Sequence, residues 1–203
     1  MKKFISLTFL FLSISGLSQK DYLSILDSNI SFRREMNRDY SDSLKSPLTK
    51  EDLKIFIELP FFEIDTGFYI IARFEKSKST KPFEMKTSTS RKPIYKEYGI
   101  IYFEINKKKF SLKIYQNQKL KEIEKYKDYL FLPFTDNSNG TETYGGGRYL
   151  DLKIPQDSTI VLDFNKAYNP YCAYNHGYSC PVPPKENYLD IKIEAGVRFN
   201  SEE

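Results

Sequence analysis

The sequence predicts a mainly β domain, an antiparallel sandwich or partly open barrel of about seven strands, with one to three α-helices at its N-terminus. Two observations carry this prediction. Aromatic residues are abundant, with 16 Phe and 16 Tyr among 203 residues, and such side chains suit a pleated, half-buried surface. Apolar residues recur at spacings of three and four in the first part of the chain, and at every second position in several segments after Phe68. A single domain is expected over residues 19–203.

The first eighteen residues have the pattern of a secretory signal peptide. Lys2 and Lys3 precede an apolar run over residues 4–14, and small residues precede the predicted cleavage point after Ser18. This run is much shorter than the roughly 20 apolar residues of a transmembrane helix. We therefore expect export to the periplasm or the medium, with no membrane span in the mature chain.

The charge distribution argues against a nucleic-acid partner. The net charge is +4, and Lys and Glu alternate along much of the chain. A nucleic-acid-binding domain would instead concentrate its basic residues in one stripe.

The N-terminal part of the domain is expected to be helical. Residues 19–46 predict one or two amphipathic helices, because their sparse apolar residues are three and four positions apart. A short helix follows, with Thr49 as its expected N-cap and Glu51 and Asp52 in its first turn. Pro60 ends the helical part.

Period-two alternation predicts the strands. The first begins at Phe68, and residues 99–105 and 110–115 form the clearest hairpin, turning at Asn106. Further strands are expected over residues 129–134, 148–154, 160–164 and 189–195. Two connections stay open at this point: residues 75–96 predict either a flexible surface loop or an ordered lid, and residues 117–128 either a short helix or a loop.

The most distinctive residues lie between Pro133 and Asn187, a stretch that holds both cysteines, the single histidine and the one triple glycine. Arg148 follows this triple glycine and shares the parity of Leu150 and Leu152, so its guanidinium is expected to point toward the interior. A buried arginine needs a partner. That partner is either an anionic ligand held by the guanidinium fork or an internal carboxylate, for which the candidates are Asp136, Glu142 and Asp163.

A polar pocket around Arg148 is the resulting ligand hypothesis. The candidate ligand-binding residues come from loops at the mouths of two strands: Asp136, Glu142, Tyr144, Arg148, Asp163, Asn165, Asn169 and Tyr174. The expected ligand is small and polar or anionic. The alternative is structural, because Asn side chains also hold loops rigid by bonding to their own backbone.

Cys172 and Cys180 are most simply a disulfide if the protein is exported. With His176 they show the four-residue spacing of metal ligands on a helix, but Pro170 and Pro181 argue against a helix there, so no metal site is predicted. A Cys–His nucleophile pair stays open on composition alone. No cofactor is predicted, because the glycines match neither a P-loop nor a dinucleotide-binding fingerprint.

The chain resembles a bacterial family, domain of unknown function 1684, in three blocks. These are L-P-F-T-D at 132–136, E-T-Y-G-G-G-R-Y-L at 142–150 and D-F-N-K-A-Y-N-P-Y-C-A-Y at 163–174. The resemblance extends over roughly residues 31–196. It implies that residues 75–96 are ordered, that His176 has no catalytic or metal-binding role, and that both cysteines stay reduced in members without an export signal. It implies no activity.

Together these observations favour an exported β-rich domain that binds a small polar or anionic ligand near Arg148. Two alternatives stay open. One is a hydrolase of a small polar or saccharide substrate, using carboxylates among Asp136, Glu142 and Asp163. The other is a structural or interaction module of the cell envelope. The sequence leaves both catalysis and the oligomeric state undecided.

Overall fold

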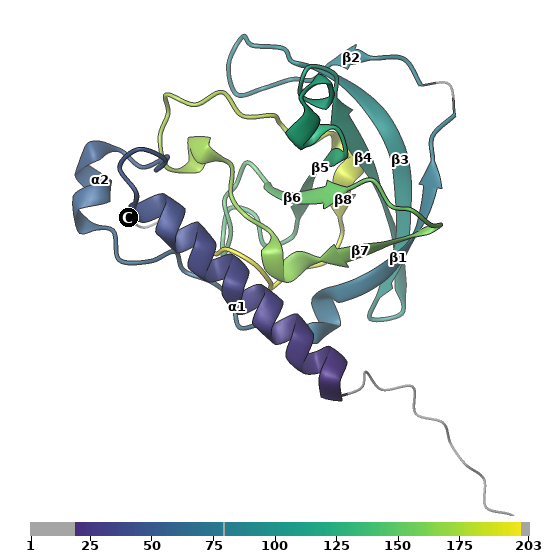
Figure 1. Cartoon of the computed structure of the whole chain (residues 1–203), viewed down its shortest axis with the longest axis horizontal. Coiled ribbons are helices and arrows are strands. Elements are labelled where there is room, and N and C mark those ends of the chain that lie inside the picture. The colour runs from purple at the N-terminus through teal and green to yellow at the C-terminus, as the bar shows by residue number, and fades with distance from the viewer. Residues whose placement is uncertain (1–18, 79, 200–203) are drawn as a thin grey trace, which may run out of the picture.

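The computed structural model describes residues 19–78 and 80–199, which form one curled, half-barrel sheet with a long helix along one side (Figure 1). The predicted signal peptide lies outside these residues. None of the helices within the described ranges has the length and apolar content that a membrane crossing requires.

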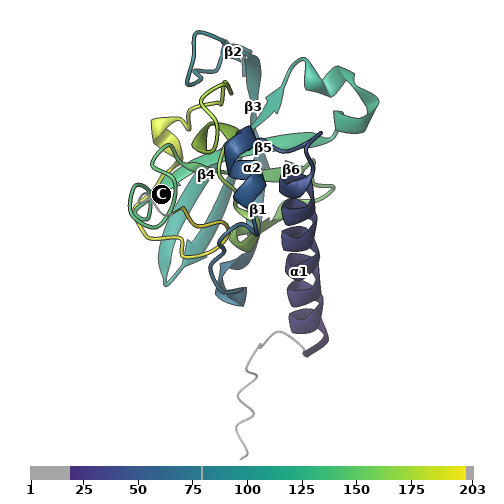
Figure 2. The same ribbon diagram turned by 90° about the vertical axis from the view of Figure 1, so that its left-hand side faces the viewer.

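Two α-helices precede the sheet, as the sequence predicts. Residues 19–46 contain one helix, α1 (Gln19–Ser41), and α2 (Lys50–Ile55) follows. The predicted N-cap is confirmed, because the Thr49 hydroxyl accepts from the Asp52 amide at 3.1 Å. Helix α1 stands beside the sheet (Figure 2), and buried Asn29 anchors it by donating to Asp163 at 2.9 Å.

The sheet contains eight strands, which confirms a mainly β fold. They are β1 (Tyr69–Lys76), β2 (Phe83–Glu84), β3 (Ile94–Ile105), β4 (Lys108–Asn117), β5 (Tyr129–Asp136), β6 (Arg148–Lys153), β7 (Thr159–Asp163) and β8 (Tyr188–Leu189). Their main order is β6-β5-β4-β3-β1-β7, with β2 on β3, all antiparallel, and β8 parallel to β5. The predicted hairpin is confirmed as β3 and β4, and it turns through Asn106 and Lys107, whose φ angles are 51° and 62°.

The segment after β7 partly closes the half-barrel. Tyr168 pairs with Tyr149 of β6 through two backbone hydrogen bonds of 2.9 and 3.0 Å. This pairing covers part of the outer edge of β6, which limits the exposed edge that a half-barrel would otherwise offer.

The predicted last strand over residues 189–195 is wrong in extent, because only Tyr188–Leu189 forms a strand. Ile193 and Ala195 are buried as their alternation predicts. Their carbonyl groups, however, accept hydrogen bonds from the Arg148 side chain. A side chain therefore satisfies the backbone here in place of a neighbouring strand.

Both undecided connections contain regular structure. Within the described part of residues 75–96, Met85 is buried and the Arg91 guanidinium donates to the Ser179 carbonyl at 2.5 Å, which fits an ordered segment. Residues 117–128 contain two short 3₁₀ turns, Leu120–Glu122 and Glu124–Tyr126.

Candidate functional site

Arg148 points into the interior, as its parity predicts, and its side chain is 0% exposed. Its partner is the internal carboxylate: Nη2 lies 2.8 Å from Oδ2 of Asp136. The same guanidinium donates to the carbonyls of Ala195 at 2.5 Å and Ile193 at 2.7 Å. These protein groups occupy both terminal nitrogens of the guanidinium, which is the structural alternative of the sequence analysis.

Asp136 is fully engaged as well. Its Oδ1 accepts from the amide of Ser138 at 2.8 Å, from the hydroxyl of Ser138 at 2.5 Å and from the amide of Ile193 at 3.1 Å. A buried ion pair is tolerated when further hydrogen bonds satisfy its remaining atoms. The pair ties β5 and β6 to the C-terminal segment.

The other predicted carboxylates do not converge on Arg148. Glu142 pairs with the Lys192 ammonium at 2.7 Å near the surface. Asp163 accepts from Asn29 on α1 and, at 3.0 Å, from the side chain of Asn165. The three carboxylates Asp136, Glu142 and Asp163 thus belong to separate networks, which gives no support to a paired-carboxylate hydrolase.

The remaining predicted residues also have internal partners. The Asn169 side chain donates to the Tyr174 hydroxyl at 3.1 Å and to the Arg198 carbonyl at 3.2 Å. Burial raises the pKa of Tyr174 to about 12. The Tyr144 hydroxyl lies 4.0 Å from Sγ of Cys172.

Both cysteines are free thiols in this structure, so the predicted disulfide is not formed in it. The two residues are nevertheless adjacent. The sulfur of Cys180 lies 3.2 Å from the backbone nitrogen of Cys172 and accepts its hydrogen bond.

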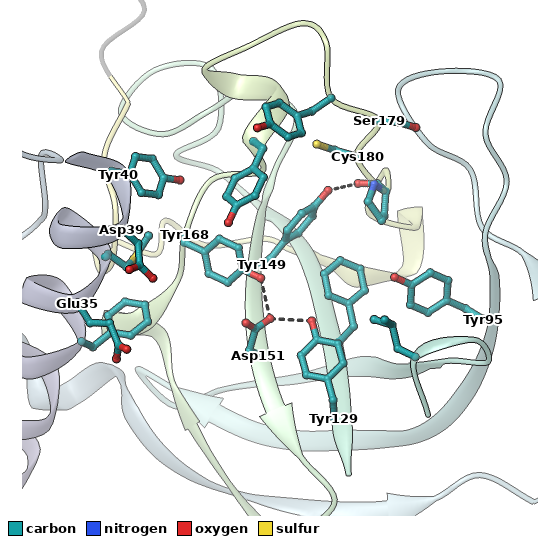
Figure 3. Close-up of a pocket in the computed structure, with 17 residues that line it drawn as sticks. Glu35, Asp39, Tyr40, Tyr95, Tyr129, Tyr149, Asp151, Tyr168, Ser179 and Cys180 are labelled. Carbon is teal, nitrogen blue, oxygen red and sulfur yellow. Dashed lines mark hydrogen bonds between the residues drawn. The ribbon is translucent and has the colours of Figure 1, made fainter. Parts of the chain in front are cut away.

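A pocket of about 490 Å³ lies on the opposite face of β6 from Arg148 (Figure 3). Most of its lining is aromatic, including Tyr95, Tyr129, Phe131, Tyr149, Tyr168 and Tyr178. Three carboxylates, Glu35, Asp39 and Asp151, also line it. Among the residues that the structure describes, no lysine or arginine lines this pocket, and none of the eight predicted ligand-binding residues does.

Strand geometry explains why the sheet presents these side chains. In β6 the even-numbered residues Leu150 and Leu152 enter the core, so Asp151 faces the other side. Asp151 is paired with Phe131 of β5, which shares its face. Residues from α1 form the facing wall, where Glu35, Asp39 and Tyr40 are labelled in Figure 3.

Asp151 is the central polar group of the pocket. Its Oδ1 accepts hydrogen bonds from the Tyr129 hydroxyl at 2.8 Å and the Tyr168 hydroxyl at 2.6 Å (Figure 3). The carboxylate is solvent-accessible where it lines the pocket. Desolvation by the surrounding protein raises the pKa of Asp151, and the two phenol hydrogen bonds oppose this rise without cancelling it.

Asp151 also differs from the other two carboxylates of the pocket. Glu35 pairs with Arg38 at 3.3 Å, and Asp39 pairs with Lys45 at 3.0 Å. Asp151 forms no ion pair with any described residue. Of the three carboxylates in the described lining of the pocket, Asp151 is therefore the one without a cationic partner.

Two tyrosines complete the polar character of the pocket. The Tyr149 hydroxyl donates to the carbonyl of Pro181. The Tyr40 hydroxyl is buried, lies near Tyr174 and makes no hydrogen bond of ordinary geometry within the described part of the chain. Burial raises the pKa of Tyr40, so its hydroxyl stays protonated.

Comparison with known proteins gives the family. A family model described as a protein of unknown function, DUF1684, matches residues 54–198, which is well over half of the chain. The chain belongs to the DUF1684 family. A solved solution structure of an uncharacterised protein from Haloarcula marismortui is similar, with a TM-score of 0.70 and 30% identity over 91% of this chain and 97% of the other. No curated protein matches.

The DUF1684 match divides the pocket into two parts. The β-strand and loop residues that line it, from Tyr95 to Pro181, lie inside the matched residues 54–198. The facing residues of α1, from Phe32 to Tyr40, precede them. Helix α1 therefore supplies one wall of the pocket from outside the matched region.

Sequence reasoning missed this pocket because it followed only the core-facing parity of each strand. A signal was present in the opposite parity. Tyr129 and Phe131 alternate with core leucines in β5, and Tyr149 and Asp151 do the same in β6. An outward face on which three of these four residues are aromatic indicates that another element covers it.

Proposed function

We propose that this DUF1684 protein is an exported binding protein that holds a small organic cation, an amine or a quaternary ammonium compound, against Asp151. The supporting observation is the unpaired carboxylate in an aromatic pocket whose described lining contains no lysine or arginine. Ring faces attract cations by about 0.5–2 kcal/mol each. A carboxylate adds a charge-assisted hydrogen bond to an amine, or a direct charge to a quaternary nitrogen.

The dimensions of the pocket agree with a ligand of metabolite size. A volume of about 490 Å³ lies within the range of roughly 300–1,000 Å³ that is usual for small-molecule sites. Tyr129 and Tyr168 fix the carboxylate through Oδ1, which leaves Oδ2 of Asp151 for the ligand. The aromatic walls supply the apolar surface that an alkylammonium group buries.

The predicted anionic ligand at Arg148 receives no support from the geometry. Asp136 and two backbone carbonyls already occupy the guanidinium, and the side chain is fully buried. An anion would have to displace a carboxylate from a sealed site. We therefore place the proposed ligand site at Asp151 and not at Arg148.

A thermal-shift panel at low salt tests the proposal. Choline and putrescine represent quaternary and primary ammonium compounds, acetate represents an anion, and glucose represents a saccharide. We expect at least one of the two cations to raise the melting temperature, because a ligand that binds only the folded state stabilises it. Acetate and glucose should leave it unchanged.

Two variants make the panel specific. Asp151→Asn should remove the shift, because it deletes the charge and keeps the size. Asp157→Asn, at an exposed position between β6 and β7, is the matched control and should keep the shift. A shift by acetate alone, a shift that persists in Asp151→Asn, or no shift by either cation would contradict the proposal.

The exported state has its own test. The N-terminal pattern supports cleavage after Ser18, so the full chain expressed in a Gram-negative host should yield periplasmic protein that begins at Gln19. Protein that stays in the cytoplasm with Lys2 and Lys3 still attached would refute export.

A further inference from the structure

The loop between Pro170 and Pro181 brings together two thiols that the cation site does not use. Cys172 lies in a 3₁₀ turn, Tyr171–Ala173, and Cys180 lies eight positions later. The sulfur of Cys180 accepts from the Cys172 amide at 3.2 Å, which places the two residues next to each other. The pair is thus placed for direct contact while both thiols are free.

The two cysteines differ in exposure. Cys172 is partly exposed, whereas Cys180 is buried. An external reagent therefore reaches Cys172 more readily than Cys180. This is the arrangement of an attacking thiol and a resolving thiol.

The surroundings of Cys172 favour a thiolate. The Tyr144 hydroxyl lies 4.0 Å from Sγ of Cys172, and the Ser88 hydroxyl accepts from the Cys180 amide at 3.1 Å. The hydrogen bond from Cys180 is the largest of the causes that lower the pKa of Cys172, to about 6, while the same interaction raises the pKa of Cys180. The other titratable groups that interact electrostatically with the pair are Tyr40, Tyr149, Tyr171 and Arg91.

We propose that Cys172 and Cys180 form a redox-active dithiol that exchanges with small disulfides, with Cys172 as the attacking thiolate and Cys180 as the resolving thiol. Cys172 attacks one sulfur of the small disulfide, which gives a mixed disulfide and releases one thiolate that takes up a proton. Cys180 then loses its proton and attacks the sulfur of Cys172, which forms the Cys172–Cys180 disulfide and releases the second thiol. The protein loses two electrons and two protons, and the small disulfide gains them.

This inference stands apart from the proposed cation site. Cys180 and its neighbours Ser179 and Pro181 line the aromatic pocket, but Cys172 does not. The thiol chemistry requires neither Asp151 nor a bound cation. Failure of either proposal therefore leaves the other intact.

Oxidised glutathione and intact-mass spectrometry test the exchange. The mature chain is first reduced and freed of reductant, then mixed with excess oxidised glutathione under native conditions. Wild type should lose the mass of two hydrogen atoms as the internal disulfide forms. Cys180→Ser should stop at the mixed disulfide and gain one glutathionyl group on Cys172. Cys172→Ser should react at least tenfold more slowly.

Wild type that stays a dithiol, or the two single variants forming mixed disulfides at the same rate, would refute the assigned roles. Thermal unfolding of each variant verifies that it folds. If either serine variant does not fold, Tyr144→Phe replaces it as the probe.

Alkylation of Cys172 by iodoacetamide, followed over pH by peptide mass spectrometry, supplies that second readout. Only the thiolate reacts, so the rate of the wild type should reach half of its maximum near the pKa of about 6. Loss of the Tyr144 hydroxyl should move this midpoint to higher pH. A wild-type midpoint at the value of an unperturbed cysteine, about 8.5, would overturn the proposal.

Discussion

Arg148 and Asp151 lie on the same strand, and the fold treats their charges in opposite ways. Arg148 faces the core, where an ion pair with Asp136 and two backbone carbonyls satisfy it. Asp151 faces the aromatic pocket, where two phenols bind one of its oxygens and no described cation neutralises it. A carboxylate of the protein neutralises the first charge. The second charge has no such partner among the described residues that line the pocket.

This difference distinguishes a charged side chain that stabilises the fold from one that is available for function. A buried charge that pairs with an internal carboxylate and with backbone carbonyls holds segments together, here β5, β6 and the C-terminal residues. A carboxylate in a pocket that keeps a raised pKa is held in a setting that disfavours its ionised form. Proteins tolerate such groups where function requires them, at some cost in stability. The predictions below test whether the two charges separate in this way.

The largest expected effect follows loss of the buried ion pair. Arg148→Met should lower the free energy of unfolding by about 3–5 kcal/mol, because it leaves the Asp136 carboxylate buried without its cation. Urea-induced unfolding measures this loss. Arg73→Met removes an exposed arginine of β1 and should cost at most about 1 kcal/mol. Equal losses in the two variants would show that the Arg148 pair is not structural.

The next effect concerns Asp151 and separates binding from stability. Asp151→Asn should weaken choline binding at least tenfold, about 1.4 kcal/mol. Its free energy of unfolding at neutral pH should stay equal or rise. The pKa of this carboxyl is raised in the fold, so its ionised form destabilises the folded state as pH rises through the folded pKa, and the amide removes that penalty. Calorimetric titration and urea unfolding measure the two quantities. A variant that loses stability and keeps its affinity would reverse the assignment.

A smaller effect is expected for the Tyr149 hydroxyl, which donates to the Pro181 carbonyl at the wall of the pocket. Tyr149→Phe should lower the free energy of unfolding by about 1 kcal/mol, the usual contribution of one hydrogen bond. Tyr22→Phe, at an exposed position of α1, is the control and should have no measurable effect. The hydrogen bond would carry no net stability if both variants unfold alike.

The smallest effect is the pH dependence of cation binding. Affinity should fall as the solution is acidified from neutrality through the raised pKa of Asp151, because the protonated carboxyl attracts a cation less. The total loss should not exceed that caused by Asp151→Asn, and the variant should show a flat profile. Binding that strengthens in acid would rule out an ionised Asp151 as the cation partner.

The features of the fold that depend on local periodicity could be predicted from the sequence. Alternation placed the β3–β4 hairpin, and the shared parity of Arg148 and Leu150 gave the inward direction of the arginine. Asp136 was among the carboxylates expected as its partner, but its backbone partners could not be predicted, because the carbonyls of Ile193 and Ala195 bind a side chain in place of a neighbouring strand. That substitution depends on how the C-terminal segment packs, which periodicity does not encode.

The pocket was harder to predict because its parts are distant in the chain. Helix α1, strands β5 and β6, and the loop around Cys180 meet only after the sheet curls. The sequence contained the outward aromatic parity of Tyr129 and Phe131, but not the element that covers it. The residues predicted around Arg148 belong to several separate networks of hydrogen bonds and ion pairs, from strands as well as loops.

The most direct measurement is a pair of calorimetric titrations with choline and its uncharged carbon isostere, in which a tert-butyl group replaces the trimethylammonium group. The two ligands have nearly the same shape, so they differ in charge alone. If Asp151 and the surrounding rings recognise a cation, choline should bind wild type at least tenfold more tightly than the isostere, and Asp151→Asn should reduce this ratio toward one. Equal affinities of the two ligands for the wild type would contradict the account.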